Sequence, residues 1–91
     1  MTETTTPSAE GLDGVQALMQ AGQIPDALES LNQLPEDDRQ SQMGLYMRAV
    51  CLRHLKEKMG AEQVLLTLID RFPNYGRGFQ EVGHLYRDAL H

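Results

Sequence analysis

The side chains with the greatest chemical reactivity in this chain are one cysteine and three histidines. Cys51 and His54 lie three positions apart, so they share one face of a predicted helix. This spacing could pair a thiol with an imidazole, as a cysteine nucleophile requires. Free cysteines usually pack as small apolar residues, and we expect this of Cys51. A metal site needs three or four converging ligands, which Cys51, His54, His84 and His91 do not supply. We therefore expect no catalytic, cofactor or metal site in this chain, and no enzyme activity.

Composition and charge restrict the function further. The chain has 91 residues and a net charge of −5, which fits one domain and disfavours nucleic-acid binding. Residues 1–38 hold eight acidic side chains and no Lys or Arg, whereas residues 39–91 hold all eight basic ones. No apolar run approaches a membrane span, and the N-terminus lacks a secretory pattern. The single cysteine fits a reducing compartment, so we expect a cytoplasmic protein without nucleic-acid or membrane partners.

The apolar residues recur at helical spacing and predict an all-α chain of about five helices. Residues 1–8 are Thr-rich and polar, and we expect a disordered tail there. Ser8 is a plausible N-cap for the first helix, Gly22 ends it, and Pro25 suits the first turn of the second. Residues 35–41 form either a polar connector or the first turn of the third helix. The predicted helices span about 8–21, 24–34, 38–55 or 41–55, 61–71 and 75–90.

Two short amphipathic segments repeat with a period of 34 residues. Ala27 and Ala61 occupy the same position in two matching frames. The first frame contains Leu18, Gly22, Ala27, Leu31 and Leu34, and the second contains Leu52, Lys56, Ala61, Leu65 and Leu68. A third, partial frame contains Phe79, Val82, Gly83 and Tyr86. Paired short helices with this period are typical of repeat proteins, whose units must stack to bury their apolar faces.

These frames resemble the tetratricopeptide-repeat family over about residues 9–90. The second unit fits well through Leu45, Ala49 and Pro73, but it departs at Arg48, where leucine is usual, and at Lys56, where glycine is usual. The resemblance implies antiparallel helix pairs stacked as a short right-handed superhelix, with units at about 8–40 and 42–75 and a terminal helix at 75–90. The stretches 48–55 and 73–84 are also similar to the leading repeats of bacterial proteins that join such repeats to a sulfotransferase domain.

The resemblance also implies a binding surface, because the family holds peptides against the concave side of its first helices. Residues at the matching positions mix soft apolar, aromatic and basic side chains. They are Met43, Tyr46, Val50, Arg53, His54, Arg77, Gln80, His84 and Arg87, with Gln16 and Met19 from the first unit. The arginines suggest a partner with acidic or C-terminal carboxylate character. Family members that bind chaperone tails clamp them with a particular set of residues. Of the matching positions in this chain only Arg77 carries the right charge, so that set is not present.

The last predicted helix raises the question of what covers the end of the stack. We expect Phe79, Val82 and Tyr86 to pack onto the fourth helix, with Leu85 and Ala89 facing outward. Such an exposed apolar end would belong to a fragment of a longer protein or to a self-associating one. Three functions therefore fit these residues: a protein-binding module or scaffold, a non-catalytic accessory domain of a larger enzyme such as a sulfotransferase, and a self-association module.

Overall fold

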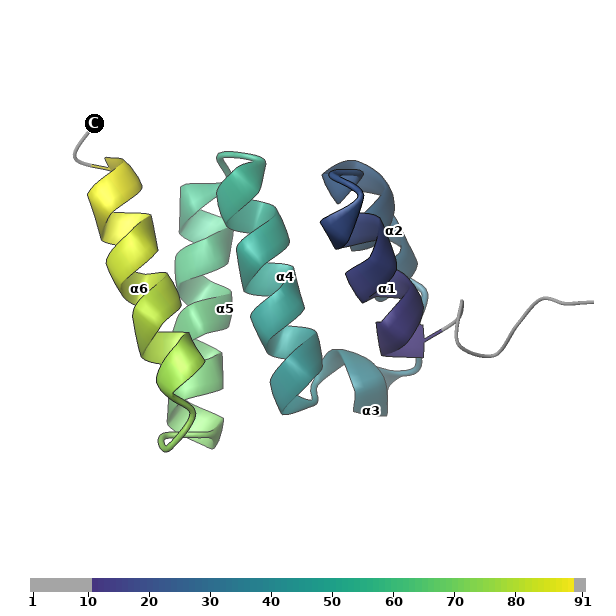
Figure 1. Ribbon diagram of the computed structural model, residues 1–91. Coiled ribbons are helices and arrows are strands. Elements are labelled where there is room, and N and C mark those ends of the chain that lie inside the picture. The colour runs from purple at the N-terminus through teal and green to yellow at the C-terminus, as the bar shows by residue number, and fades with distance from the viewer. Residues whose placement is uncertain (1–10, 90–91) are drawn as a thin grey trace, which may run out of the picture.

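The computed structural model describes residues 11–89, and every regular element in this range is a helix. The helices are α1 (Gly11–Gln20), α2 (Ile24–Asn32), α3 (Glu36–Arg39), α4 (Gln42–His54), α5 (Lys58–Arg71) and α6 (Gly76–Ala89). The pairs α1–α2 and α4–α5 are antiparallel, and α6 lies at one end of the stack (Figure 1). The predicted all-α class is confirmed, whereas Ser8 and the predicted tail at 1–8 lie outside the described residues. None of the described helices is both long and apolar enough to cross a membrane.

The segment between α2 and α4 forms the separate one-turn helix α3, so the prediction of five helices was one too few for the described range. The chain breaks before α4 because Ser41 caps that helix, accepting a hydrogen bond from the Gly44 amide at 3.0 Å. The Ser41 hydroxyl also donates to the Asp38 carbonyl at 2.7 Å. Gly44 is required here, because a Cβ atom would collide with the backbone oxygens of Asp38 and Arg39.

The turns that join α1 to α2 and α4 to α5 have the same geometry. Gly22 has a φ of 81° and Lys56, 34 positions later, has a φ of 67°. In both turns the following residue donates its amide to the carbonyl five positions back, at 2.9 Å. Ala27 and Ala61, which follow at equal distances, are both fully buried. The 34-residue period of the sequence is therefore also a period of the backbone.

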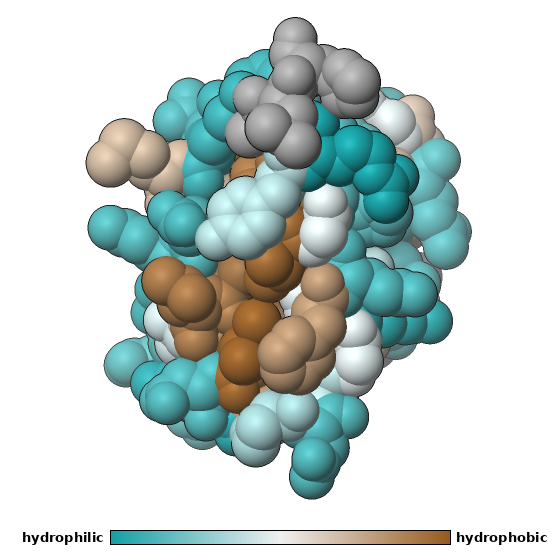
Figure 2. Space-filling view, turned by 90° about the vertical axis from the view of Figure 1, so that its left-hand side faces the viewer, coloured by the Kyte–Doolittle hydropathy of each residue, from teal (hydrophilic) through white to brown (hydrophobic). Residues whose placement is uncertain are grey.

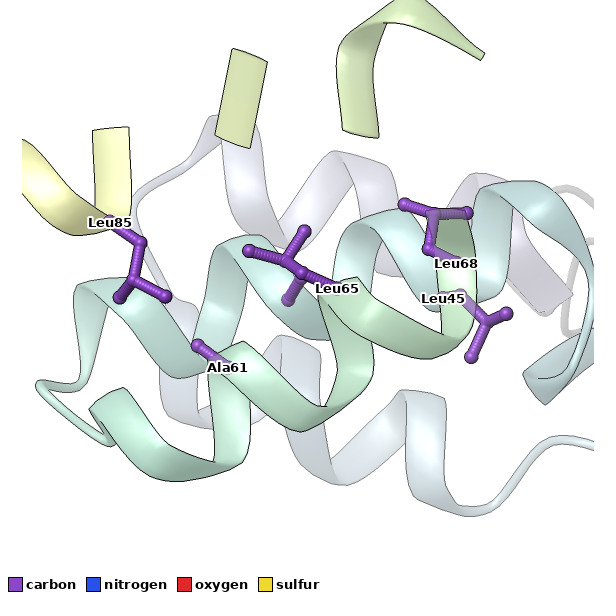
Figure 3. Packing of buried hydrophobic residues seen from close by; sticks show 6 residues of the cluster. Leu45, Ala61, Leu65, Leu68 and Leu85 are labelled. Carbon is purple, nitrogen blue, oxygen red and sulfur yellow. The ribbon is translucent and has the colours of Figure 1, made fainter. Parts of the chain in front are cut away.

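Two apolar clusters hold the helices together, and α4 contributes to both of them. The first joins α1, α2 and α4 through Val15, Ala27, Leu31, Met47 and Cys51. The second joins α4, α5 and α6 through Leu45, Ala49, Ala61, Leu65, Leu68 and Leu85 (Figure 3). The small residues Ala49 and Ala61 are fully buried between α4 and α5, where they allow the two helices to approach closely.

The orientation of α6 differs from the prediction, although Val82 packs against the second apolar cluster as expected. Leu85 is buried at 4% exposure, whereas Phe79 and Tyr86 are each 51% exposed. The buried positions of α6 are Gly78, Glu81 and Leu85, spaced three and four residues apart. Gly78 lies against Leu68 and Ile69 of α5. Because glycine has no side chain, α6 can approach α5 closely here without contributing an apolar side chain of its own. The side chain of Ala89, which was predicted to face outward, lies outside the described residues.

Candidate functional site

The structure has a groove of about 270 Å³ between α1, α4 and α6, with Ile24 of α2 at its side. Most of its lining side chains are apolar or uncharged, and three of them are methionines. The lining residues are Gln16, Met19, Gln20, Ile24, Met43, Tyr46, Met47, Val50, His54 and Arg77. The predicted residues Met43, Tyr46, Val50, His54 and Arg77 thus meet at one site, together with Gln16 and Met19 from the first unit.

Tyr46 is placed by two neighbours at the α6 side of the groove. Its ring meets the ring of Tyr75 edge to face, with centroids 5.8 Å apart and planes at 83°. The Arg77 guanidinium carbon lies 5.8 Å from the Tyr46 centroid, within reach of a cation–π contact. Burial, followed by the nearby Glu81 carboxylate, raises the pKa of Tyr46, so its hydroxyl is neutral at physiological pH. A neutral tyrosine beside an arginine offers a hydrogen-bond donor next to a positive charge.

Arg53 does not line this groove. Its Nε donates to Glu81 Oε1 at 2.8 Å and its Nη1 donates to Asp88 Oδ2 at 3.1 Å. The Glu81 side chain is 6% exposed and that of Arg53 17%, so this ion pair is largely shielded from water. Arg53 therefore links α4 to α6 instead of presenting a free charge to a partner. The sequence placed Arg53 on the binding side, but it gave no sign that Glu81 would be buried beside it.

The remaining predicted residues of α6 do not join the groove. Gln80 and Arg87 are exposed, His84 is half-buried, and none of the three lines the groove. Gln20, Ile24 and Met47 also line the groove, although they were not predicted from the sequence to do so. The spacing could have identified Met47, since it lies one helical turn after Met43. Ile24 had no such signal, because it enters the groove from the start of α2.

Cys51 and His54 lie in different environments and do not form a reactive pair in the structure. Cys51 is fully buried in the cluster of α1, α2 and α4, and this burial raises the pKa of its thiol to about 11. His54 is exposed, so the pair does not share one environment. Within residues 11–89, no three His, Cys, Asp or Glu side chains lie close enough together to hold a metal ion.

One permanently charged side chain lines the groove, and the Glu81 carboxylate outside the lining also acts on Tyr46. No Asp or Glu lines the groove, and Arg77 is its one permanently charged side chain. Arg77 is exposed, and no ion pair within the described range involves it. The groove therefore offers a mostly apolar lining with one cation, in a protein whose overall charge is −5.

Comparisons with protein-family models, with curated proteins and with solved structures found no match to this chain.

Proposed function

We infer that this chain is a protein-interaction module that holds a peptide, or a segment of a partner protein, in the groove between α1, α4 and α6. The observation that carries this inference is the convergence of Met19 and Met43 from two helices on one open groove, which the largely buried Met47 also lines. Methionine side chains are flexible and polarizable, so they adapt to irregular apolar surfaces. Such a lining suits a partner that inserts one or two apolar side chains.

A carboxylate near the inserted side chains would complete the recognition. Arg77 can bind a carboxylate with two parallel hydrogen bonds, while its position over the Tyr46 ring limits its freedom. No lining residue would repel an anion. We therefore expect the preferred segment to carry Asp, Glu or a free C-terminus beside its apolar anchor, with Arg77 and not Arg53 as its partner.

The proposed function agrees with the proposed resemblance to tetratricopeptide repeats. The repeated turn geometry at Gly22 and Lys56 and the buried pair Ala27 and Ala61 support that resemblance. A scaffold of stacked helices provides a binding surface and needs no reactive group. The single cysteine fits a reducing compartment, so we place the proposed interaction in the cytoplasm.

The proposal can be tested by selecting ligands from a library of short random peptides and measuring their affinities. Met43→Glu places a charge in the apolar groove, whereas Met59→Glu places the same charge at a site 79% exposed at the start of α5. Selected peptides should bind the native protein and Met59→Glu alike, and should lose about tenfold or more with Met43→Glu. Equal affinity for both variants, with both folded by circular dichroism, would contradict the proposal.

The charge preference needs a second pair of variants. Arg77→Glu should remove the preference for acidic peptides, while Arg87→Glu, also on α6 but away from the groove, should leave it intact. If both variants reduce binding equally, the effect comes from net charge and not from recognition at Arg77.

A further inference from the structure

The outer face of α6, formed by Phe79, Gly83 and Tyr86, is apolar, and none of the residues that the structure describes covers it. Phe79 and Tyr86 are each 51% exposed, and a Cβ atom added at Gly83 would meet nothing within 4 Å. Figure 2 views the molecule from this side and shows hydrophobic side chains gathered in the middle of the face, with hydrophilic residues around them. No member of this outer face carries a charge or lines the groove described above.

The exposed apolar surface continues onto α5. The Tyr86 hydroxyl lies 3.2 Å from a Glu62 carboxylate oxygen, and a Cβ at Gly78 would lie 3.6 Å from Ile69. Leu66 lies between Glu62 and Ile69 on the same face of α5, and it is 59% exposed. Three of the four large hydrophobic residues that are strongly exposed in the described range therefore gather at this end of the stack.

The chain itself shows how such a face is covered. The residues 34 positions before Phe79, Gly83 and Tyr86 are Leu45, Ala49 and Leu52 of α4. Leu45 and Ala49 are buried at 4% and 0% exposure by the antiparallel helix α5. At this contact a small residue of each helix, Ala49 and Ala61, allows close approach, and larger residues fill the space on either side. A helix that covers α6 in the same way must be antiparallel to it and must present a small residue opposite Gly83.

Helix α6 of a second copy meets these requirements. Along its outer face a large residue is followed by a small one and then by another large one, so the order of sizes is the same in either direction along the helix. A two-fold axis at Gly83 would set the two glycines against each other and would place Phe79 of each copy near Tyr86 of the other. Aromatic pairs of this kind add to the burial of apolar area. Arg87, one turn after Gly83, would lie near Phe79 of the other copy, so the two Arg87 side chains would not meet.

We propose that two copies of this chain associate through antiparallel packing of their α6 helices about Gly83. A helix of 14 residues is about 21 Å long, so the contact is smaller than a standard protein interface. The dimer should accordingly be weak and reversible. This inference is independent of the proposed peptide groove, which shares no residue with the outer face.

Sedimentation equilibrium over a range of protein concentrations tests the proposal. The mass should rise from 10.2 kDa at low concentration toward twice that value. Gly83→Leu should stay monomeric at every concentration and remain folded, since the site has free space within one copy. Ala17→Leu, the matched change at an exposed position of α1, should behave as the native protein does. A constant mass of 10.2 kDa, or self-association that survives Gly83→Leu, would overturn the proposal.

Disulfide trapping tests the orientation of the two helices. Gly83→Cys should form a covalent dimer under mild oxidation, because the two sulfurs would meet at the axis. Gly76→Cys lies on the same face two turns away, so in the antiparallel pair its two copies are about 21 Å apart and should not crosslink. The native Cys51 is fully buried and does not compete. Crosslinking at position 76 as efficient as that at position 83 would contradict the antiparallel arrangement.

Discussion

Arg53→Ala should destabilise the protein chiefly by releasing α6 from α4. In the native structure Arg53 forms an ion pair with Glu81, whose side chain is only 6% exposed. Without Arg53, the Glu81 carboxylate would be buried without a positive partner. Removing one member of a buried pair costs more than the pair contributes, because the remaining charge keeps its desolvation penalty.

The magnitude follows from the burial of the two groups. Breaking a fully buried ion pair costs about 3–5 kcal/mol. The Arg53 side chain retains 17% exposure, so water can reach the site and we expect about 2–3 kcal/mol in the free energy of unfolding. For a chain of this size, such a loss lowers the melting temperature by roughly 10–20 °C. The loss is a large part of the total stability expected for a domain of this size, which is about 5–15 kcal/mol.

Urea unfolding followed by circular dichroism measures this loss, and hydrogen exchange locates it. Exchange should accelerate in α6 before it does so in α1 and α2. The matched control is Arg71→Ala, since Arg71 is exposed and donates to the Gln40 side chain at 3.0 Å, and its loss should change stability by no more than about 0.5 kcal/mol. The double variant Arg53→Met with Glu81→Leu should recover most of the loss. A loss below about 0.5 kcal/mol for Arg53→Ala would refute the reasoning.

Three further predictions concern single positions. Lys56→Gly should raise the free energy of unfolding by about 0.5–1 kcal/mol, because glycine adopts the left-handed backbone at this position without steric strain. Gly22→Lys should lower it for the same reason, and thermal unfolding measures both changes. The Cys51 thiol, with a pKa of about 11 in place of 9.0, should react about 100-fold more slowly with a disulfide reagent at pH 8 than it does in urea, and equal rates would contradict its burial. The hydrogen bond from Arg53 lowers the pKa of Asp88 from its ordinary value of 3.8. The stability that this contact contributes is therefore present above pH 3.8 and is lost as the pH falls through the pKa that Asp88 has in the folded protein. A carboxyl titration by NMR should show the Asp88 pKa rising in Arg53→Ala.

The parts of the fold that local chemistry determines could be predicted from the sequence. Gly22 as a turn residue and the buried pair Ala27 and Ala61 each follow from one residue type at one position. The short helix α3 was harder to predict, because the residues after Pro35 suit either a connector or a helix start.

The orientation of α6 could not be predicted from hydrophobicity alone. Its outer face contains the aromatic residues Phe79 and Tyr86, whereas its buried face contains Gly78 and Glu81 beside Leu85. Glu81 becomes buried because Arg53 of another helix neutralises it, and this pairing depends on tertiary structure. The same pairing explains why Arg53 does not line the groove. Tyr46 and Arg77 do line it, since their positions depend on helix periodicity and less on particular partners.

The most direct test of the central inference is to map, residue by residue, where a selected peptide binds the ¹⁵N-labelled native protein. The inference predicts that the amide signals of Met43, Tyr46, Val50 and Arg77 shift together and saturate with one affinity, while those of Met59 and Leu66 stay in place. Saturable shifts centred on the outer face of α6, with the signals of the groove unchanged, would contradict it.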